Sequence, residues 1–255
     1  MYDEKIALEY NFENWALGEF NRFWCYAQSP RLGDVSPDFP LWQLDESETR
    51  LHEALSQHRL SIVMFGSFSC PLARMAQNRM EELADNFSDE SVGALYIYTH
   101  EAHPGENVII HRSMADKFEM AKRQAEISEP VWQFLVDSLD GACHRAFGAM
   151  PNMCWIFTRD GQAVYKAEWT VPYNVQFALR CLLHLDEQLS EREAVLMHTS
   201  EVVMGVTLDM EDHDCIMEDN GPQALDEFRG ALGHWSERRM WPSRMGEGAP
   251  AQTTS

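Results

Sequence analysis

The sequence predicts an α/β fold in which helices flank a central mixed sheet, and three observations support this. Two compact apolar runs, 60–65 and 92–98, have the composition of buried strands, and each is followed by a stretch with helical periodicity. Farther along, Arg159-Asp160-Gly161 separates two short apolar segments and is typical of a hairpin turn. The length of 255 residues and the apolar content of 45% suit one large domain with appended segments.

The first part of the chain is predicted to be helical and then irregular. Residues 3–27 carry apolar side chains at helix-like intervals, which indicates one or two amphipathic helices. Turn-forming residues introduce a short extended segment that ends near Leu44, and a helix is expected over 46–57. The aromatic residues of the first segment exceed what one surface helix buries, so we expect either a homodimer interface or a substrate wall there. They are Trp15, Phe20, Phe23, Trp24 and Tyr26.

The central part of the chain alternates between strand-like and helix-like segments. Two pairs of a strand and a helix, followed by a hairpin and a last helix with Pro172 in its first turn, form the layout of a thioredoxin-like sheet. The sequence therefore predicts that fold. The expected elements are strands over 60–65, 92–98 and 131–136, helices over 71–87 and 112–125, a hairpin over 153–157 and 163–166, and a helix over 172–189.

The C-terminal part differs from the centre in composition. Residues 190–206 are expected to extend the last helix, 209–220 to form a solvated acidic loop, and a further helix to run from Gly221 to about Met240. The final residues have the composition of a flexible end. We therefore divide the chain into an N-terminal helical extension (1–29), a thioredoxin-like domain (30–189), a C-terminal helical extension (190–241) and a tail (242–255).

Charge and hydropathy limit the classes of partner. The chain has 41 acidic and 20 basic residues, a formal charge of -21. Such a surface repels phosphate backbones and anionic membranes, so we expect neither nucleic acid nor a membrane as a partner. We see neither a signal-peptide pattern at the N-terminus nor an apolar stretch long enough to span a bilayer, which favours a cytoplasmic location.

Six cysteines are scattered along the chain, without a C-x-x-C pair or a metal-type pairing. In a reducing compartment such cysteines are expected to be free thiols and not a disulfide scaffold. His100 and His103 have the spacing of a metal pair but lack a second set of ligands, so we expect no metal site.

Cys70 stands apart because of its setting. The segment 65–72 joins a predicted buried strand to a predicted helix, and Pro71 suits the first helical position. Cys70 would then lie at the helix N-terminus, where free N–H groups and the helix dipole lower a thiol pKa and favour the nucleophilic thiolate. The alternative is a small buried residue. Because Ala73 occupies the fourth position, Cys70 has no partner for local dithiol exchange.

Two further residues are candidates beside Cys70. Thioredoxin-like folds place a cis-proline next to the reactive cysteine just before the hairpin, and Pro151 occupies that position; an ordinary trans proline is the alternative. Cys143 is expected in a loop near the same edge of the sheet, where it would either resolve a disulfide with Cys70 or be a spectator.

Four motifs resemble the iodothyronine deiodinase family and its bacterial relatives, which have a thioredoxin-like fold. They match in order and with compatible spacing between about residues 30 and 185. In this resemblance Cys70 stands where the animal enzymes carry selenocysteine, and Phe68 stands where many of them carry a cysteine. The motifs are the turn 66–71, the strand 95–104 that ends in Glu-Ala-His-Pro, the segment 109–113, and 146–149 before the hairpin.

The resemblance implies that Glu101, His103 and His111 are active-site residues beside Cys70. A histidine paired with a carboxylate can supply the proton that is needed after a thiolate attacks a soft electrophile. The loop 168–171 lacks the arginine with which family members hold the iodothyronine phenol. The residues expected to bind substrate are Ser67, Phe68, Ser69, Pro151 and Trp169.

The leading functional hypothesis is a deiodinase-like thiol oxidoreductase that acts on a halogenated aromatic or another electrophilic small molecule. We expect it to need no cofactor and to use an external thiol as reductant. One alternative is a peroxiredoxin-like peroxidase or thiol reductase, although Val63 and Ser67 occupy the proline and threonine positions of the P-x-x-x-T-x-x-C pattern. The other alternative is a non-catalytic redoxin module that binds a protein or metabolite.

Overall fold

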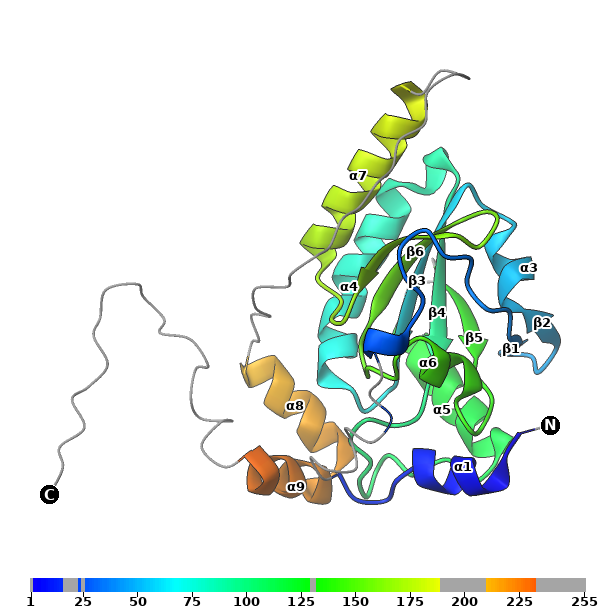
Figure 1. Cartoon of the computed structure of the whole chain (residues 1–255). Helices are drawn as coiled ribbons and strands as arrows, with labels where there is room; N and C mark the ends of the chain where they lie inside the picture. Colours follow the sequence, from blue (N-terminus) through cyan, green and yellow to red (C-terminus); the bar gives the residue numbers. More distant parts are fainter. Residues whose placement is uncertain (1, 16–22, 24–25, 129–131, 189–209, 233–255) are drawn as a thin grey trace, which may run out of the picture.

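A seven-stranded mixed sheet forms the centre of the protein (Figure 1). The computed structural model describes residues 2–15, 23, 26–128, 132–188 and 210–232. In space the strands follow the order β2-β1-β5-β4-β3-β6-β7. Their bounds are β1 Pro40–Gln43, β2 Glu48–Arg50, β3 Leu60–Gly66, β4 Val92–Tyr98, β5 Gln133–Val136, β6 Cys154–Thr158 and β7 Ala163–Ala167.

Strand direction follows from the connections. β3, β4 and β5 are parallel neighbours, and they are linked by helices that cross over the sheet. β6 and β7 are antiparallel, because only the short turn around Asp160 joins them. The helices are α1 Glu4–Tyr10, α3 Leu51–Leu55, α4 Pro71–Asn86, α5 Met114–Glu126, α6 Ala142–Ala146, α7 Pro172–Gln188, α8 Met210–Asn220 and α9 Pro222–Leu232, with 3-10 turns η2 Tyr26–Gln28 and η3 Ser88–Glu90.

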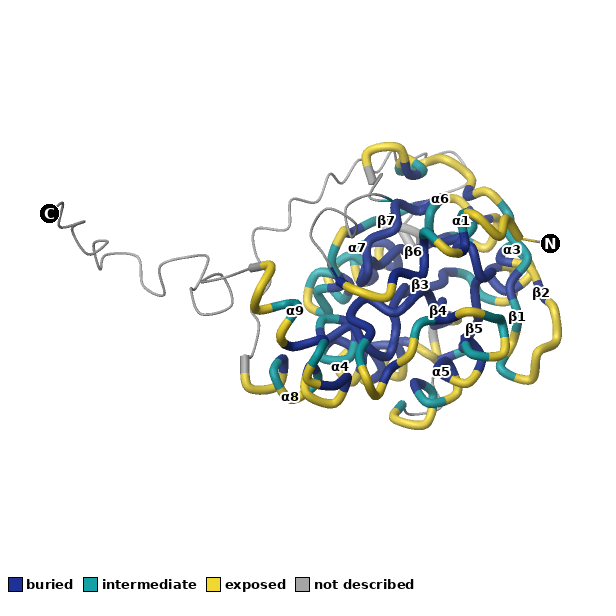
Figure 2. The backbone as a smooth tube through the Cα atoms, turned by 90° about the horizontal axis from the view of Figure 1, so that it is seen from below, coloured by how far each residue is buried: buried dark blue, intermediate teal, exposed yellow. Residues whose placement is uncertain are grey.

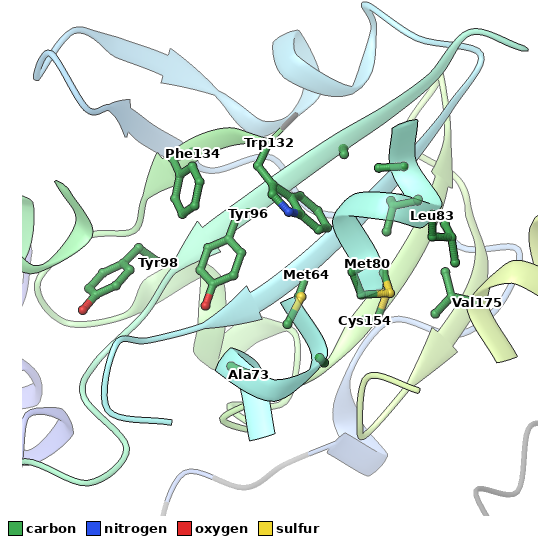
Figure 3. Close-up of a cluster of buried hydrophobic side chains, with 14 of the residues drawn as sticks. Met64, Ala73, Met80, Leu83, Tyr96, Tyr98, Trp132, Phe134, Cys154 and Val175 are labelled. Carbon is green, nitrogen blue, oxygen red and sulfur yellow. The ribbon is translucent and has the colours of Figure 1, made fainter. Parts of the chain in front are cut away.

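The sheet separates two apolar cores. Alternate residues of each central strand face opposite sides, so that Met64 of β3 enters the first core and Phe65 enters the second. The first core lies between the sheet and helices α4, α5 and α7 (Figure 3), and the second lies under α3 and α6. Figure 2 shows the central strands buried and the outer loops exposed. The predicted thioredoxin-like α/β fold is confirmed.

Two predicted elements were wrong. A helix was expected over 46–57, but Asp45 caps a tight turn in which Glu46 has a φ of 71°, and the chain returns as strand β2 before the short helix α3. An acidic loop was expected over 209–220, but this segment is helix α8. Its carboxylates lie mainly on its outer side, while Met217 and His213 are buried against the rest of the protein.

The segment before β6 also differs from expectation. No peptide bond among the residues that the structure describes is cis, so the expected cis-proline at Pro151 is absent. The chain turns instead at Gly148 and Ala149, whose φ values are 111° and 55°, and Pro151 follows in the trans form. Cys143 lies in the short helix α6 and not in a loop.

The N-terminal extension begins with α1, which Asp3 caps by accepting N–H bonds from Lys5 and Ile6. Tyr10 at its end is fully buried. The predictions that concern 16–22, 24–25, 189–209 and 233–255 lie outside the described residues. None of the described helices is long and apolar enough to cross a membrane.

Candidate active site at the Cys70 turn

The turn between β3 and α4 is built as the sequence predicts. Cys70 is the N-cap residue of α4, and Pro71 opens the helix. Gly66 ends β3, and a Cβ atom at this position would overlap the hydroxyl of Tyr96 on the neighbouring strand. The close approach of that ring therefore requires glycine at the start of the turn.

A second loop, which follows β4, holds the turn in place. β3 and β4 are parallel neighbours, so their carboxyl ends bring both loops to one edge of the sheet. The N–H of Ala102 donates to Ser67 Oγ at 3.2 Å, and the N–H of His103 donates to Ser69 Oγ at 3.0 Å. Ser67 and Ser69 thus fix the two loops together, and both side chains are buried.

Glu101 lies at the centre of this junction. Its Oε2 accepts the N–H of Ser69 at 2.9 Å, and its Oε1 accepts both the Tyr98 hydroxyl and, at 3.2 Å, His111 Nε2. Burial alone would raise the pKa of this carboxyl, but its interactions with His111, Ser69 and Tyr98 lower it below its usual range. Glu101 is therefore ionised, and it binds the backbone of Ser69, the residue that precedes Cys70 in the turn.

His111 is the direct partner of that carboxylate. Burial lowers its pKa, although Glu101 acts in the opposite direction. A neutral ring that donates from Nε2 to Glu101 leaves Nδ1 as an acceptor, and Nδ1 has no hydrogen-bond partner within the described parts of the chain. The Glu101–His111 pair can therefore accept a further proton.

His103 lies among aromatic rings. Its ring centroid is 5.2 Å from that of Trp15 and 5.5 Å from that of Phe228 on α9. Burial, with the charge of His213, lowers the pKa of His103 to about 3. His103 is therefore neutral at physiological pH in this structure, and the histidine that pairs with Glu101 is His111.

The sulfur of Cys70 is covered, with 1% of the residue exposed. Burial raises the pKa of the Cys70 thiol to about 12, although the N–H groups of Ala73 and Leu72 at the start of α4 oppose the rise. The charge of Glu101 raises it further. The expected low pKa was wrong for this state of the protein, because the loss of solvent outweighs the helix N-terminus.

The structure brings some predicted site residues together and separates others. Phe68 is buried, and its ring makes cation–π contacts with two guanidinium groups. The ring centroid lies 4.8 Å from the guanidinium group of Arg74 and 4.5 Å from that of Arg123. Pro151 is buried in the turn before β6. Trp169 packs against the second core, whereas Cys70 belongs to the first.

Cys143 also belongs to the second core and is fully buried. The sheet therefore lies between the apolar surroundings of Cys70 and those of Cys143, and this arrangement does not bring Cys143 to Cys70.

Two site residues escaped the sequence analysis. Tyr98 donates to Glu101, and its position at the end of β4, three residues before Glu101, is a signal that could have revealed it. Asn220 donates from Nδ2 to the carbonyl oxygen of Ser69 at 2.9 Å. It lies 151 residues from Ser69 in the chain, and no local pattern points to it.

Known proteins that are similar to this chain include one family and several solved structures. A profile of the iodothyronine deiodinase family matches residues 18–187. A hypothetical protein from Sinorhizobium meliloti 1021 superposes with a TM-score of 0.50 at 16% identity, over 61% of this chain and 86% of that one. An uncharacterized conserved protein from Geobacillus kaustophilus superposes with a TM-score of 0.49 at 22% identity, over 60% of this chain and 82% of that one.

The thioredoxin domain of a thiol-disulfide oxidoreductase from Bacteroides vulgatus is also similar, with a TM-score of 0.46 at 13% identity, over 61% of this chain and 99% of that one. The helices α8 and α9 lie outside the segment that matches the family profile.

Proposed function

This chain belongs to the iodothyronine deiodinase family, and from that premise we propose that it is a thiol-dependent oxidoreductase that reductively removes halide from an aromatic substrate. The family supports a redox function for the fold. Cys70 is the nucleophile of the proposed reaction, and Glu101 and His111 move the proton.

The proposed first step exchanges a carbon–halogen bond for a sulfur–halogen bond. The sulfur of Cys70 attacks the halogen, the aryl carbon leaves with the bonding electron pair, and the carbon takes up a proton. The thiol loses one proton and the aryl carbon gains one, so the Glu101–His111 pair needs only to carry a proton from the sulfur to the carbon. The products are the dehalogenated aromatic and a sulfenyl halide on Cys70.

The second half of the cycle restores the cysteine. One external thiol displaces halide from the sulfur and forms a mixed disulfide, and a second thiol reduces it. The sum is aryl halide plus two thiols giving the reduced aromatic, one disulfide and one hydrogen halide. An external reductant is proposed because Ala73 occupies the position of the second cysteine in a C-x-x-C pair and Cys143 belongs to the opposite core. No cofactor is needed for this cycle.

One observation carries the proposal: a buried carboxylate of lowered pKa binds the Ser69 N–H next to Cys70 and binds His111 through its other oxygen. A buried carboxylate with a purely structural role needs no partner that can exchange protons. Glu101 has such a partner in His111, and it lies next to the turn that carries the Cys70 thiol.

The test is release of halide from a panel of iodinated phenols in the presence of dithiothreitol. Cys70→Ser is expected to abolish release. The matched control is Cys215→Ser, which removes an exposed thiol on α8 and is expected to leave release unchanged.

Absence of halide release across the whole panel would rule out dehalogenation. If Cys70 is instead converted to sulfenic acid rapidly by one equivalent of peroxide, the peroxidase alternative replaces the proposal.

A further inference from the structure

The helical pair α8–α9 covers the edge of the sheet where Cys70 lies. Figure 1 shows both helices at the lower end of α4, on the side of the molecule where α1 also lies. The contact with the Cys70 turn is direct, because Asn220, the last residue of α8, donates to the carbonyl oxygen of Ser69. Asn220 is fully buried, and its Oδ1 has no hydrogen-bond partner among the residues described.

The junction is close-packed at its centre. The backbone oxygen of Asn220 accepts the N–H of Asn107 at 3.1 Å, and a Cβ atom at Gly105 would overlap that same oxygen. Gly105 therefore permits α8 to approach the loop that follows Glu101 and His103. Substitution of Gly105 by a larger residue would separate the two surfaces.

The rim of the junction is polar and exposed. Arg74 contacts Asp219 at 3.4 Å, and the N–H of Gln223 donates to the carboxylate of Glu106 at 2.9 Å. Met217, Ala224 and Leu225 form a buried cluster within the helical pair itself, with Phe228 packed against it. Across the junction, the ring of Phe228 contacts the rings of Trp15 and His103. Exposed polar contacts and a few ring contacts stabilise such a junction far less than the two cores stabilise the sheet.

We propose that Asn220 is a positioning residue of the active-site turn, and that α8–α9 is a cap that covers Cys70 and must move for substrate to enter. The inference rests on the proposed role of Cys70. Substrate has to reach a sulfur that is now covered, and α8–α9 is attached at this edge of the sheet through polar, exposed contacts. In the closed state the amide of Asn220 fixes the Ser69 carbonyl, and the free Oδ1 can accept a hydrogen bond from a bound ligand.

The test measures how fast iodoacetamide modifies each cysteine in the full-length folded protein, by peptide mass spectrometry. Gly105→Ala acts as a wedge against Asn220, and Gly230→Ala is its control, because a Cβ atom at Gly230 on α9 meets nothing within 4 Å. Cys215 is exposed and reports reagent activity, whereas Cys154 is fully buried in β6 and reports global unfolding.

The wedge is expected to accelerate modification of Cys70 at least about fivefold, the effect of one net hydrogen bond on an opening equilibrium. Cys154 should stay protected, and Gly230→Ala should behave as the wild type. If Cys70 keeps its wild-type rate, or if Cys70 and Cys154 become reactive together, the cap is refuted. Because this measurement requires no substrate, it tests the cap even if no dehalogenation is detected.

A second pair of variants isolates Asn220 as a positioning residue. Asn220→Asp keeps the shape but removes the N–H donor to Ser69, and its control is Asn107→Asp, which removes a similar donor to the Asp219 carbonyl at the exposed rim. Asn220→Asp should accelerate Cys70 modification and lower kcat more than it raises KM, with Cys154 protected. Equal behaviour of the two variants would show that Asn220 contributes only general attachment.

Discussion

Two buried carboxylates at neighbouring strand ends behave in opposite ways. Glu101 follows β4 and Asp137 follows β5, and both are buried. Burial raises the pKa of Asp137, and the charge of Lys117 and the backbone N–H groups around it do not reverse the rise. His111 and the other partners of Glu101 do reverse it, so that the pKa of Glu101 is lowered.

The partners explain what each carboxylate can do. Asp137 accepts the backbone N–H groups of Ser138, Cys143 and His144 at 2.7, 3.1 and 2.9 Å, and so fixes the start of α6. Those amides cannot exchange protons in catalysis. Glu101 binds His111, which can. Equal burial therefore produces a structural group in one place and a proton-relay candidate in the other.

The largest expected effect is on chemistry. Glu101→Gln keeps an oxygen for Ser69 but removes the charge that His111 and Cys70 face, so halide release should fall by about 10³-fold. Steady-state release of iodide measures this, with circular dichroism as the check on folding. Release at the wild-type rate would show that Glu101 is as structural as Asp137.

The reciprocal change acts on stability. Asp137→Asn removes the charge near the buried Lys117 and should lower the free energy of unfolding by about 3 kcal/mol. Urea unfolding measures the loss. Halide release per folded molecule should change little, and a loss comparable to that of Glu101→Gln would erase the distinction between the two carboxylates.

Acid should destabilise the protein through one buried histidine in each region, because burial lowers the pKa of His103 and that of His144 to about 3. The unfolded histidines bind protons below about pH 6.5, whereas the folded ones do not, so stability present above pH 6.5 is lost as the pH falls. Each histidine should subtract about 2 kcal/mol from the free energy of unfolding at pH 5 relative to pH 7.5. Urea unfolding that gives the same free energy at both pH values would contradict these pKa shifts.

The smallest effect is expected at Cys143. Cys143→Ala should cost about 1 kcal/mol of stability through lost packing and leave halide release within about twofold of wild type. A loss of turnover as large as that of Cys70→Ser would instead make Cys143 a resolving thiol.

Local patterns predicted the part of the fold that positions the site. The apolar runs gave β3 and β4, the helical periodicity gave α4, and Pro71 at the first helical position marked the turn that contains Cys70. The hairpin turn at Arg159-Asp160-Gly161 joined β6 and β7 as expected. These features depend on residues that are near one another in the chain.

The chemistry of Cys70 could not be predicted in this way. Its pKa depends on burial, which no local pattern reveals. Asn220, which binds the same turn, belongs to α8, a segment whose acidic composition had indicated a loop. The positive φ of Ala149, in the turn before Pro151, is likewise not apparent in the sequence. Long-range packing decides each of these outcomes.

A stoichiometric turnover tests the central claim most directly. The protein is mixed with an iodinated phenol and one equivalent of glutathione, so that no second thiol is left to reduce the mixed disulfide, and iodide is counted against the glutathione mixed disulfide found on each cysteine peptide. The account predicts one iodide for each Cys70 that becomes oxidised. The amount of mixed disulfide on Cys215 should not rise with the iodide released. Iodide released while Cys70 stays reduced, or oxidation that tracks another cysteine, would contradict it.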